Sequence, residues 1–200
     1  MDTVLPVHGP FDAAAALGAL AAHAVPGLEL VDPAAGTCTR LFPTGGGIVR
    51  ATLRLGSGSI TLHTVPAAGN PAAPCRSTAE ATAEVAAAVR GWLDLDADVA
   101  LVARVLGPDP LLGPLVAARP GLRITGYLDG FEGAVCTVLR QHVSLTAART
   151  FTARLVAAFG TAGPAPDGLR LFPTAVALAA AGPEAIRAAT GLTGARAQTV

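Results

Sequence analysis

Residues 109–159 read DPLLGPLVAARPGLRITGYLDGFEGAVCTVLRQHVSLTAARTFTARLVAAF, in which apolar residues recur at helical spacing between breaks that mostly contain proline or glycine. The same pattern continues on both sides of this stretch. It predicts helices over Val99–Leu106, Leu111–Ala118, Phe131–Leu139, Leu145–Phe159, Ala175–Ala180 and Glu184–Ala189. Residues 96–200 are therefore expected to be all helical.

The pattern before residue 95 is different, because apolar and polar residues alternate there. Residues 49–55 and 60–65 alternate on either side of Gly56–Ser59, which predicts a β-hairpin, and Cys38–Phe42 predicts a further strand. The other expected elements are helices over Ala13–Ala24 and from Ser77 or Thr78 to Trp92, and a loop over Pro66–Pro74. The chain is thus predicted to be α+β, with an N-terminal domain over residues 1–95 built on an antiparallel sheet and a helical domain over residues 96–200.

The composition excludes several classes of enzyme. The chain has 200 residues, of which 52% are hydrophobic and 14% charged, so we expect it to fold around a substantial core. It contains fourteen arginines and no lysine. A P-loop, a Schiff-base enzyme and a pyridoxal phosphate site each need a lysine, and all three are therefore excluded.

The distribution of charge indicates what the protein could bind, and the cysteine content indicates the cellular compartment. Residues 1–100 hold five arginines and nine acidic residues, a net charge of −4, whereas residues 101–200 hold nine arginines and five acidic residues, a net charge of +4. This asymmetry hints at a polyanionic partner for the basic half. Three widely separated cysteines (Cys38, Cys75 and Cys136) favour reduced thiols in a cytoplasmic protein. The sequence shows no transmembrane segment and no metal-ligand spacing, and we expect no cofactor.

Three motifs in the chain resemble those of one family. Ala118–Gly126 reads ARPGLRITG, Asp129–Glu132 reads DGFE, and Val138–Ser144 reads VLRQHVS. Together with matching segments upstream and downstream, they resemble the DNA-3-methyladenine glycosylase II family, a branch of the helix-hairpin-helix glycosylases. The resemblance implies an N-terminal antiparallel sheet followed by a helical glycosylase domain.

The resemblance also implies base-excision repair. An enzyme of this kind binds duplex DNA, inserts a wedge into the minor groove and flips an alkylated base such as 3-methyladenine into a pocket, where the N-glycosidic bond is hydrolysed. The absence of lysine is consistent with a monofunctional glycosylase, because a β-lyase of the usual kind needs an amine nucleophile.

The family's wedge has the pattern G-Q-x-V-S, and the resemblance carries this role onto residues 140–144. Arg140, Gln141, His142 and Ser144 are therefore the candidate DNA-binding residues. His142 stands at the intercalating position, where its flat ring can stack in a base step, and Arg140 replaces the glycine and could add a phosphate contact. The alternative for His142 is an ordinary surface histidine at a helix junction.

The candidate base pocket departs from the family pattern. The first helix of the family commonly reads F-L-A-x-R, whereas this chain has ALAAH at the same place, so Ala19 and His23 replace an aromatic residue and an arginine. Recognition of cationic purines by stacking is therefore expected to be weaker. Arg149 and Arg154 are expected to be surface or phosphate-facing charges.

The family's DNA-gripping hairpin and catalytic aspartate would lie beyond Val200, so no catalytic residue is assigned. Asp129 and Glu132 are expected to cap a helix instead. We expect the chain as it stands not to excise 3-methyladenine, and to expose apolar helical surface that favours self-association. Three hypotheses remain open: part of a longer active enzyme, a non-catalytic DNA-binding or lesion-sensing relative, and a small-molecule or protein-binding module.

Overall fold

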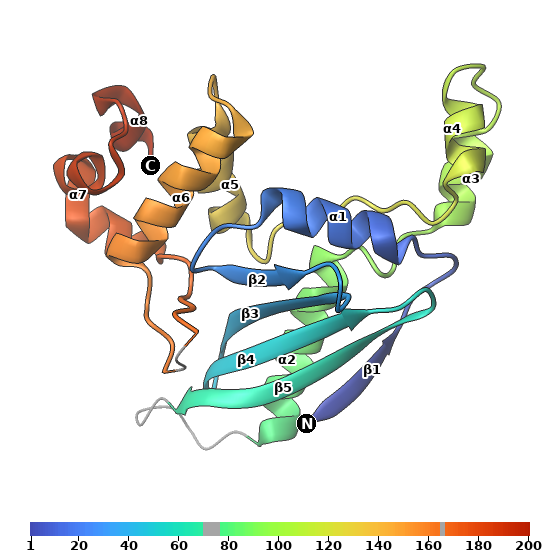
Figure 1. The fold of residues 1–200 in the computed structure, drawn as a ribbon, viewed down its shortest axis with the longest axis horizontal. Helices are drawn as coiled ribbons and strands as arrows, with labels where there is room; N and C mark the ends of the chain where they lie inside the picture. The colour runs from blue at the N-terminus through green and yellow to red at the C-terminus, as the bar shows by residue number, and fades with distance from the viewer. Residues whose placement is uncertain (70–76, 165–166) are drawn as a thin grey trace.

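The computed structural model describes residues 1–69, 77–164 and 167–200. Its centre is a five-stranded sheet in the order β1-β5-β4-β3-β2, in which every neighbouring pair is antiparallel (Figure 1). The strands are β1 (Asp2–Pro6), β2 (Glu29–Asp32), β3 (Thr37–Thr44), β4 (Gly47–Leu55) and β5 (Ser59–Gly69). The predicted α+β class, with its antiparallel sheet, is confirmed.

One predicted loop is wrong in its first part. Residues 66–69 belong to β5, which pairs with β4 as far as Gly47 opposite Gly69. The register shifts between Ile48 and Val49, and this irregularity accommodates Pro66, which has no N–H to give to a regular ladder. The rest of the predicted loop, residues 70–74, lies outside the described residues. Strands β1 and β2 were not expected, since each is short and is held by its pairing partner.

The helices follow the predicted positions closely. They are α1 (Ala13–His23), α2 (Thr78–Trp92), α3 (Val99–Leu106), α4 (Leu112–Ala118), α5 (Gly130–Arg140), α6 (Leu145–Phe159), α7 (Ala175–Thr190) and α8 (Gly194–Thr199). α7 contains the two predicted C-terminal helices, joined across a kink at Gly182, and α8 was not expected. In the described part of the chain, no helix combines the length and the apolar character needed to cross a membrane.

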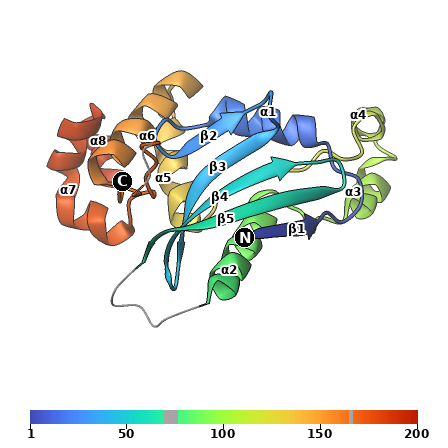
Figure 2. The ribbon, with the colours of Figure 1, turned by 60° about the horizontal axis from the view of Figure 1, so that its bottom comes forward.

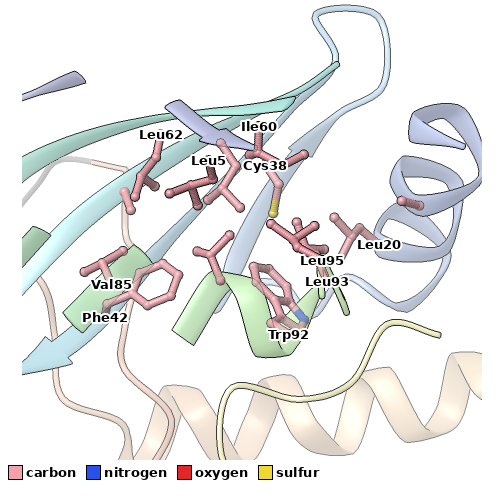
Figure 3. Close-up of a cluster of buried hydrophobic side chains, with 14 of the residues drawn as sticks. Leu5, Leu20, Cys38, Phe42, Ile60, Leu62, Val85, Trp92, Leu93 and Leu95 are labelled. Carbon is pink, nitrogen blue, oxygen red and sulfur yellow. The ribbon is translucent and has the colours of Figure 1, made fainter. Parts of the chain in front are cut away.

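The main core lies between one face of the sheet and the helices α1 and α2 (Figures 1 and 2). Alternate residues of β3, β4 and β5 point into it, as the pleat requires: Cys38, Phe42, Val49, Ala51, Leu53, Ile60 and Leu62. Figure 3 shows how Phe42 of β3 and Trp92 of α2 lie among the leucines of this cluster. A second cluster is built by α5, α6, α7 and α8, so the helical part has a core of its own.

The α3–α4 hairpin stands apart from that second cluster, at the opposite end of the molecule (Figure 1). Its side chains leave a large apolar surface open to solvent. We call this the hairpin surface; it comprises Leu101, Val102, Val105, Leu111, Leu112 and Leu115, together with Leu122 and Ile124 of the following segment.

The segment 119–129 connects the hairpin to α5 and lies against the first core. Its anchor is Arg123, whose buried guanidinium donates hydrogen bonds to the backbone carbonyls of His8, Pro10, Asp94 and Ala97. Further along, the backbone N–H of Gly126 donates to the carbonyl of Trp92 at 2.8 Å. This segment therefore fixes where α5 begins relative to the sheet.

Candidate nucleic-acid interface and pocket

The predicted wedge is the turn between α5 and α6. α5 ends at Arg140 and α6 begins at Leu145, so residues 141–144 make the whole connection. His142 is exposed and has a φ of 58°, in the left-handed region that residues other than glycine rarely adopt. Strained backbone of this kind is often found where a side chain must be presented to a partner. The turn is held by Arg196, whose guanidinium donates to the carbonyl of Gln141.

Ser144 has a local structural role. Its Oγ accepts a hydrogen bond from the backbone N–H of Ala147 at 3.2 Å, which makes it the N-cap of α6. A serine in this position stabilises a helix by satisfying one of its free N–H groups. Ser144 therefore fixes the downstream end of the wedge turn.

A pocket of about 130 Å³ lies where α1, the edge of the sheet, the 125–127 segment and α5 meet. We call it the Arg40 pocket. Its lining residues are Ala19, Leu20, His23, Val25, Leu28, Glu29, Arg40, Trp92, Thr125, Gly126, Tyr127, Glu132, Cys136 and Arg140. The structure thus brings the two candidate pocket residues, Ala19 and His23, together with Arg140 from the candidate wedge.

The inner wall of this pocket is an ion-pair network around Arg40. Residues 38, 40 and 42 of β3 share the face of the sheet that points into the core, so Arg40 is buried, with its side chain 4% exposed. Its guanidinium pairs with Glu29 of β2 at 3.0 Å and with Glu132 of α5, and it lies over the ring of Trp92, 5.6 Å from the centroid. The network therefore joins the sheet to the helix that carries the wedge.

The outer part of the pocket is formed by Arg140, Tyr127 and His23. The Arg140 guanidinium lies 5.7 Å from the centroid of the Tyr127 ring, a cation–π contact that sets its position at the mouth. Partial burial, and the positive charges of Arg140 and Arg149, lower the pKa of His23 below its usual value. This shift favours the neutral form of the His23 ring.

Burial sets the direction of the pKa shifts of Glu132 and Cys136. It raises the pKa of Glu132 although Arg40 beside it acts in the opposite direction. It also raises the pKa of the Cys136 thiol, which lines the pocket, to about 12. Cys136 is thus a protonated packing residue and offers no thiolate nucleophile at neutral pH.

The expected capping roles are half right. Asp129 caps α5, since its carboxylate accepts from the backbone N–H of Glu132 at 2.8 Å. The cap predicted for the Glu132 side chain is wrong, because the side chain turns inward to Arg40. Arg149 and Arg154 both donate to backbone carbonyls, Arg149 to Ala24 and Arg154 to Thr190.

Sequence reasoning missed the centre of the pocket. Arg40, Glu29, Tyr127 and Cys136 were not among the candidates. One signal was available for Arg40, because a charged residue in the inward register of an otherwise apolar strand must have a buried partner. No pattern in the sequence identifies Glu132 as that partner, since the two lie 92 residues apart. Within residues 1–69, 77–164 and 167–200, no group of three or more metal-ligating side chains is present.

Comparisons with known proteins bear on the family and the fold. A family model described as the AlkA N-terminal domain matches residues 2–129. A "Probable bifunctional transcriptional activator/DNA repair enzyme AlkA" of Mycobacterium tuberculosis is 40% identical over 161 residues, which cover 78% of this chain and 29% of that protein. The "DNA-3-methyladenine glycosylase 2" of Escherichia coli is 44% identical over 77 residues, which cover 38% of this chain and 27% of that protein. The chain thus spans less than a third of the length of these curated relatives.

Solved structures show the same fold at lower identity. The "3-methyladenine dna-glycosylase from Archaeoglobus fulgidus" superposes with a TM-score of 0.77 at 20% identity, over 98% of this chain and 64% of that one. An 8-oxoguanine glycosylase/lyase of Clostridium acetobutylicum, described in complex with dsDNA, has a TM-score of 0.55 at 15% identity, over 80% of this chain and 52% of that one. With the family model matching well over half of its residues, the chain belongs to the AlkA family of DNA-3-methyladenine glycosylases, as its motifs predicted.

Proposed function

We propose that this chain serves base-excision repair of alkylated DNA, by binding duplex DNA at the wedge turn and receiving a flipped, alkylated base in the Arg40 pocket. The activity to which this contributes is hydrolysis of the N-glycosidic bond of bases such as 3-methyladenine. One observation carries the proposal. The C-terminus of α5 places Arg140 on the pocket wall and puts the exposed, strained His142 only two residues further on.

Each residue of the turn would have a different role in base flipping. The flat imidazole of His142 can enter a base step and replace the stacking lost when a nucleotide leaves the helix. Arg140 stands at the pocket mouth, where a flipped nucleotide carries its phosphate, and a guanidinium is well suited to bind phosphate. Gln141 is exposed and can offer its amide to the orphaned base.

A second candidate function is binding of damaged DNA without catalysis, as a lesion sensor. The pocket chemistry favours it in one respect. The two carboxylates that line the pocket, Glu29 and Glu132, are both bound by Arg40. A carboxylate held in an ion pair is poorly placed to activate a water molecule or to stabilise a sugar cation.

The test is fluorescence anisotropy with labelled duplexes, one intact and one with an abasic site, at two salt concentrations. We expect weak, salt-sensitive binding, with a dissociation constant of roughly 10⁻⁴–10⁻⁶ M for the intact duplex, and preference for the abasic site. The Arg140→Ala, His142→Ala double variant should lose that preference, whereas Arg187→Ala, an exposed arginine of α7, should keep it. Unchanged binding in the double variant would remove the wedge role.

Base release from methylated DNA separates the two candidates. Release of 3-methyladenine by the chain supports the repair enzyme, and binding without release supports the lesion sensor. Absence of binding to either duplex at low salt would refute both.

We also propose that the chain self-associates through the hairpin surface. The support is the apolar character of this surface, which is unusual for a monomer.

A further inference from the structure

One face of α6 is largely open to solvent, whereas the opposite face carries the four buried side chains of the helix. The open face lines a groove of about 680 Å³ between α6 and the Pro26–Gly27 turn that follows α1 (Figure 1). We call it the α6 groove. Its helical side consists of Thr146, Arg149, Thr150, Ala153, Arg154 and Ala157.

The α6 groove has a stripe of small residues with an arginine on each side. The stripe consists of Thr146, Thr150, Ala153 and Ala157. Successive residues of an α-helix are rotated by about 100°, so these four share a narrow strip about 16 Å long. Arg149 and Arg154 lie on opposite flanks of the strip, about 140° apart around the helix axis. Such a surface accepts apolar side chains along its middle and negative charges at both edges.

Both arginines are held in place and keep donors free. The Nε of Arg149 donates to the carbonyl of Ala24 at 2.7 Å, and the Nη1 of Arg154 donates to the carbonyl of Thr190 at 3.0 Å. Within the described residues, neither guanidinium has a carboxylate partner or a second hydrogen bond. Arg149 keeps its two terminal nitrogens and Arg154 keeps Nε and Nη2. Each of these pairs can bind both oxygens of one carboxylate.

A second hollow extends the α6 groove along the edge of the sheet. Its volume is about 370 Å³, and Arg149 and Pro26 line both hollows. Leu30 of β2 also lines it and is 45% exposed, which gives a ligand a further apolar contact. Among the described residues that line the two hollows, Glu29 is the one acidic residue, and Arg40 already binds its carboxylate. The charge that faces a ligand is therefore positive.

The small-residue stripe favours a protein partner over nucleic acid. The backbone of DNA is polar and charged, so it gains little from the methyl groups of alanine and threonine. An amphipathic helix has apolar side chains that fill such a groove, and it can carry acidic residues on both flanks. The α6 groove also leads away from the candidate DNA interface, because Ala157 lies about 20 Å along the helix from the wedge turn.

We propose that the α6 groove binds an acidic amphipathic helix of a partner protein, with apolar side chains on the small-residue stripe and carboxylates on Arg149 and Arg154. The two arginines are about 7.5 Å apart along α6, and acidic residues four or five positions apart in a partner helix have a similar rise, about 6–7.5 Å. The inference goes beyond the proposed function, because it assigns a protein partner to a face of α6 that has no role in base flipping.

The test is fluorescence anisotropy with a labelled synthetic helix. The probe is an alanine-rich peptide of about 20 residues, long enough to be helical by itself, with leucines at i, i+4, i+7 and i+11 and glutamates on both flanks of this stripe. A peptide with glutamine in place of every glutamate is the uncharged control. We expect the wild type to bind the glutamate peptide about fivefold more tightly at low salt, as two partly exposed ion pairs should, and the preference to shrink at high salt.

Four changes assign the preference to particular residues. Arg149→Gln and Arg154→Gln should each reduce it, and the double variant should abolish it. Arg104→Gln removes the same charge from α3, at the opposite end of the molecule, and should leave the preference unchanged. Thr150→Glu puts a negative charge on the stripe itself and should prevent binding of the glutamate peptide. Circular dichroism checks that each variant is folded.

The conservative variant Arg149→Lys separates charge from structure. Lysine keeps the positive charge but cannot make the Nε hydrogen bond to Ala24. It should retain most of the preference for the glutamate peptide, whereas a purely structural role of Arg149 would lose it.

Equal affinity for the two peptides in the wild type would overturn the inference, and so would absence of binding to the glutamate peptide at low salt. A preference that survives in the Arg149→Gln, Arg154→Gln double variant would place the peptide elsewhere on the molecule. Two further results would name a different occupant and overturn the proposal. One is displacement of the peptide by duplex DNA in the Arg140→Ala, His142→Ala variant, which assigns the groove to nucleic acid. The other is loss of self-association in the Arg149→Gln, Arg154→Gln variant, which assigns it to a second copy of the chain.

Discussion

Arg40 and Glu132, 92 residues apart in sequence, form a buried ion pair that joins β3 to α5. This ion pair also affects the position of the candidate DNA interface. Glu132 lies in the first turn of α5, and the wedge turn follows the last turn of the same helix. A helix fixed at one end transmits its position along its length, about 1.5 Å per residue. The sheet thereby sets where His142 stands relative to the pocket.

Replacing Arg40 by methionine should destabilise the protein strongly. The substitution keeps a similar length but leaves Glu29 and Glu132 buried without a counter-charge, which typically costs about 3–5 kcal/mol. The measurement is urea unfolding followed by circular dichroism. Arg54→Met is the matched control, since Arg54 is exposed and should cost less than about 1 kcal/mol. Equal losses in the two variants would show that the Arg40 network contributes little.

The double variant Arg40→Met, Glu132→Gln tests whether the cost comes from the stranded carboxylate. It should be more stable than Arg40→Met alone, because a neutral amide is cheaper to bury than an unpaired charge. A double variant that is less stable than the single one would assign the loss to packing around Trp92 instead.

Sequence patterns predicted the helices well because the signals of a helix, its apolar spacing and its capping residue, lie within a few residues of each other. The boundaries of α3 and α6 match the prediction, and in each case a capping side chain marks the start, Asp98 for α3 and Ser144 for α6. β1 was not predicted, because its five residues include only one buried side chain and so show almost no alternation of apolar and polar residues. It exists through its pairing with β5.

The site was predictable only in part, for the same physical reason. The candidate wedge is one continuous turn, and the resemblance proposed its residues together, from Arg140 to Ser144. The pocket is assembled from α1, β2, β3, the 125–127 segment and α5, and contacts between such distant segments leave no periodic signal. Ala19 and His23 were proposed from the motif on α1 and both line this pocket, whereas the pairing of Arg40 with Glu132 is seen only in the structure.

The described cysteines should resist chemical modification in the folded protein. Cys38 and Cys136 are buried and free, and burial raises the pKa of each to about 12, so very little reactive thiolate exists at neutral pH. Brief treatment with a thiol reagent followed by peptide mass spectrometry should leave both unlabelled, and label both in urea. Rapid labelling of Cys136 in native buffer would show that the Arg40 pocket opens far enough to admit the reagent.

The pKa of His23 should lie below 6.5 and should respond to Arg140. Burial and the charges of Arg140 and Arg149 favour the neutral ring, so His23 should reduce stability as the pH falls below 6.5, where the unfolded chain takes up its proton first. NMR titration of the ring should show an increase in pKa in Arg140→Ala. Arg154→Ala, a change outside the pocket, should not affect it. An unchanged pKa in Arg140→Ala would show that the charge of Arg140 does not act on His23, although both residues line the pocket.

Replacing His142 by glycine should separate strain from function. Glycine adopts a φ near 58° without the clash that a Cβ makes, so the free energy of unfolding should stay the same or rise by up to about 1 kcal/mol. Preference for the abasic duplex should nevertheless be lost, because the ring is gone. Ser144→Ala is the contrasting change in the same turn, and loss of the α6 cap should cost about 1 kcal/mol. A His142→Gly variant that loses stability would show that the ring packs on the protein instead of serving as a wedge.

The hairpin surface should mediate self-association, and two charges should prevent it. Val105 and Leu115 are 64% and 66% exposed, one on each helix of the hairpin, so glutamate at both positions would have to be desolvated in any interface formed there. Sedimentation velocity across a hundredfold range of concentration should show the wild type moving from monomer toward dimer, and Val105→Glu, Leu115→Glu remaining a monomer throughout. Val176→Glu places the same charge on an equally open residue of α7, 79% exposed, and should dimerise like the wild type. If the wild type stays monomeric over the whole range, or if Val176→Glu abolishes the dimer as completely as the double variant, the hairpin surface is not the interface.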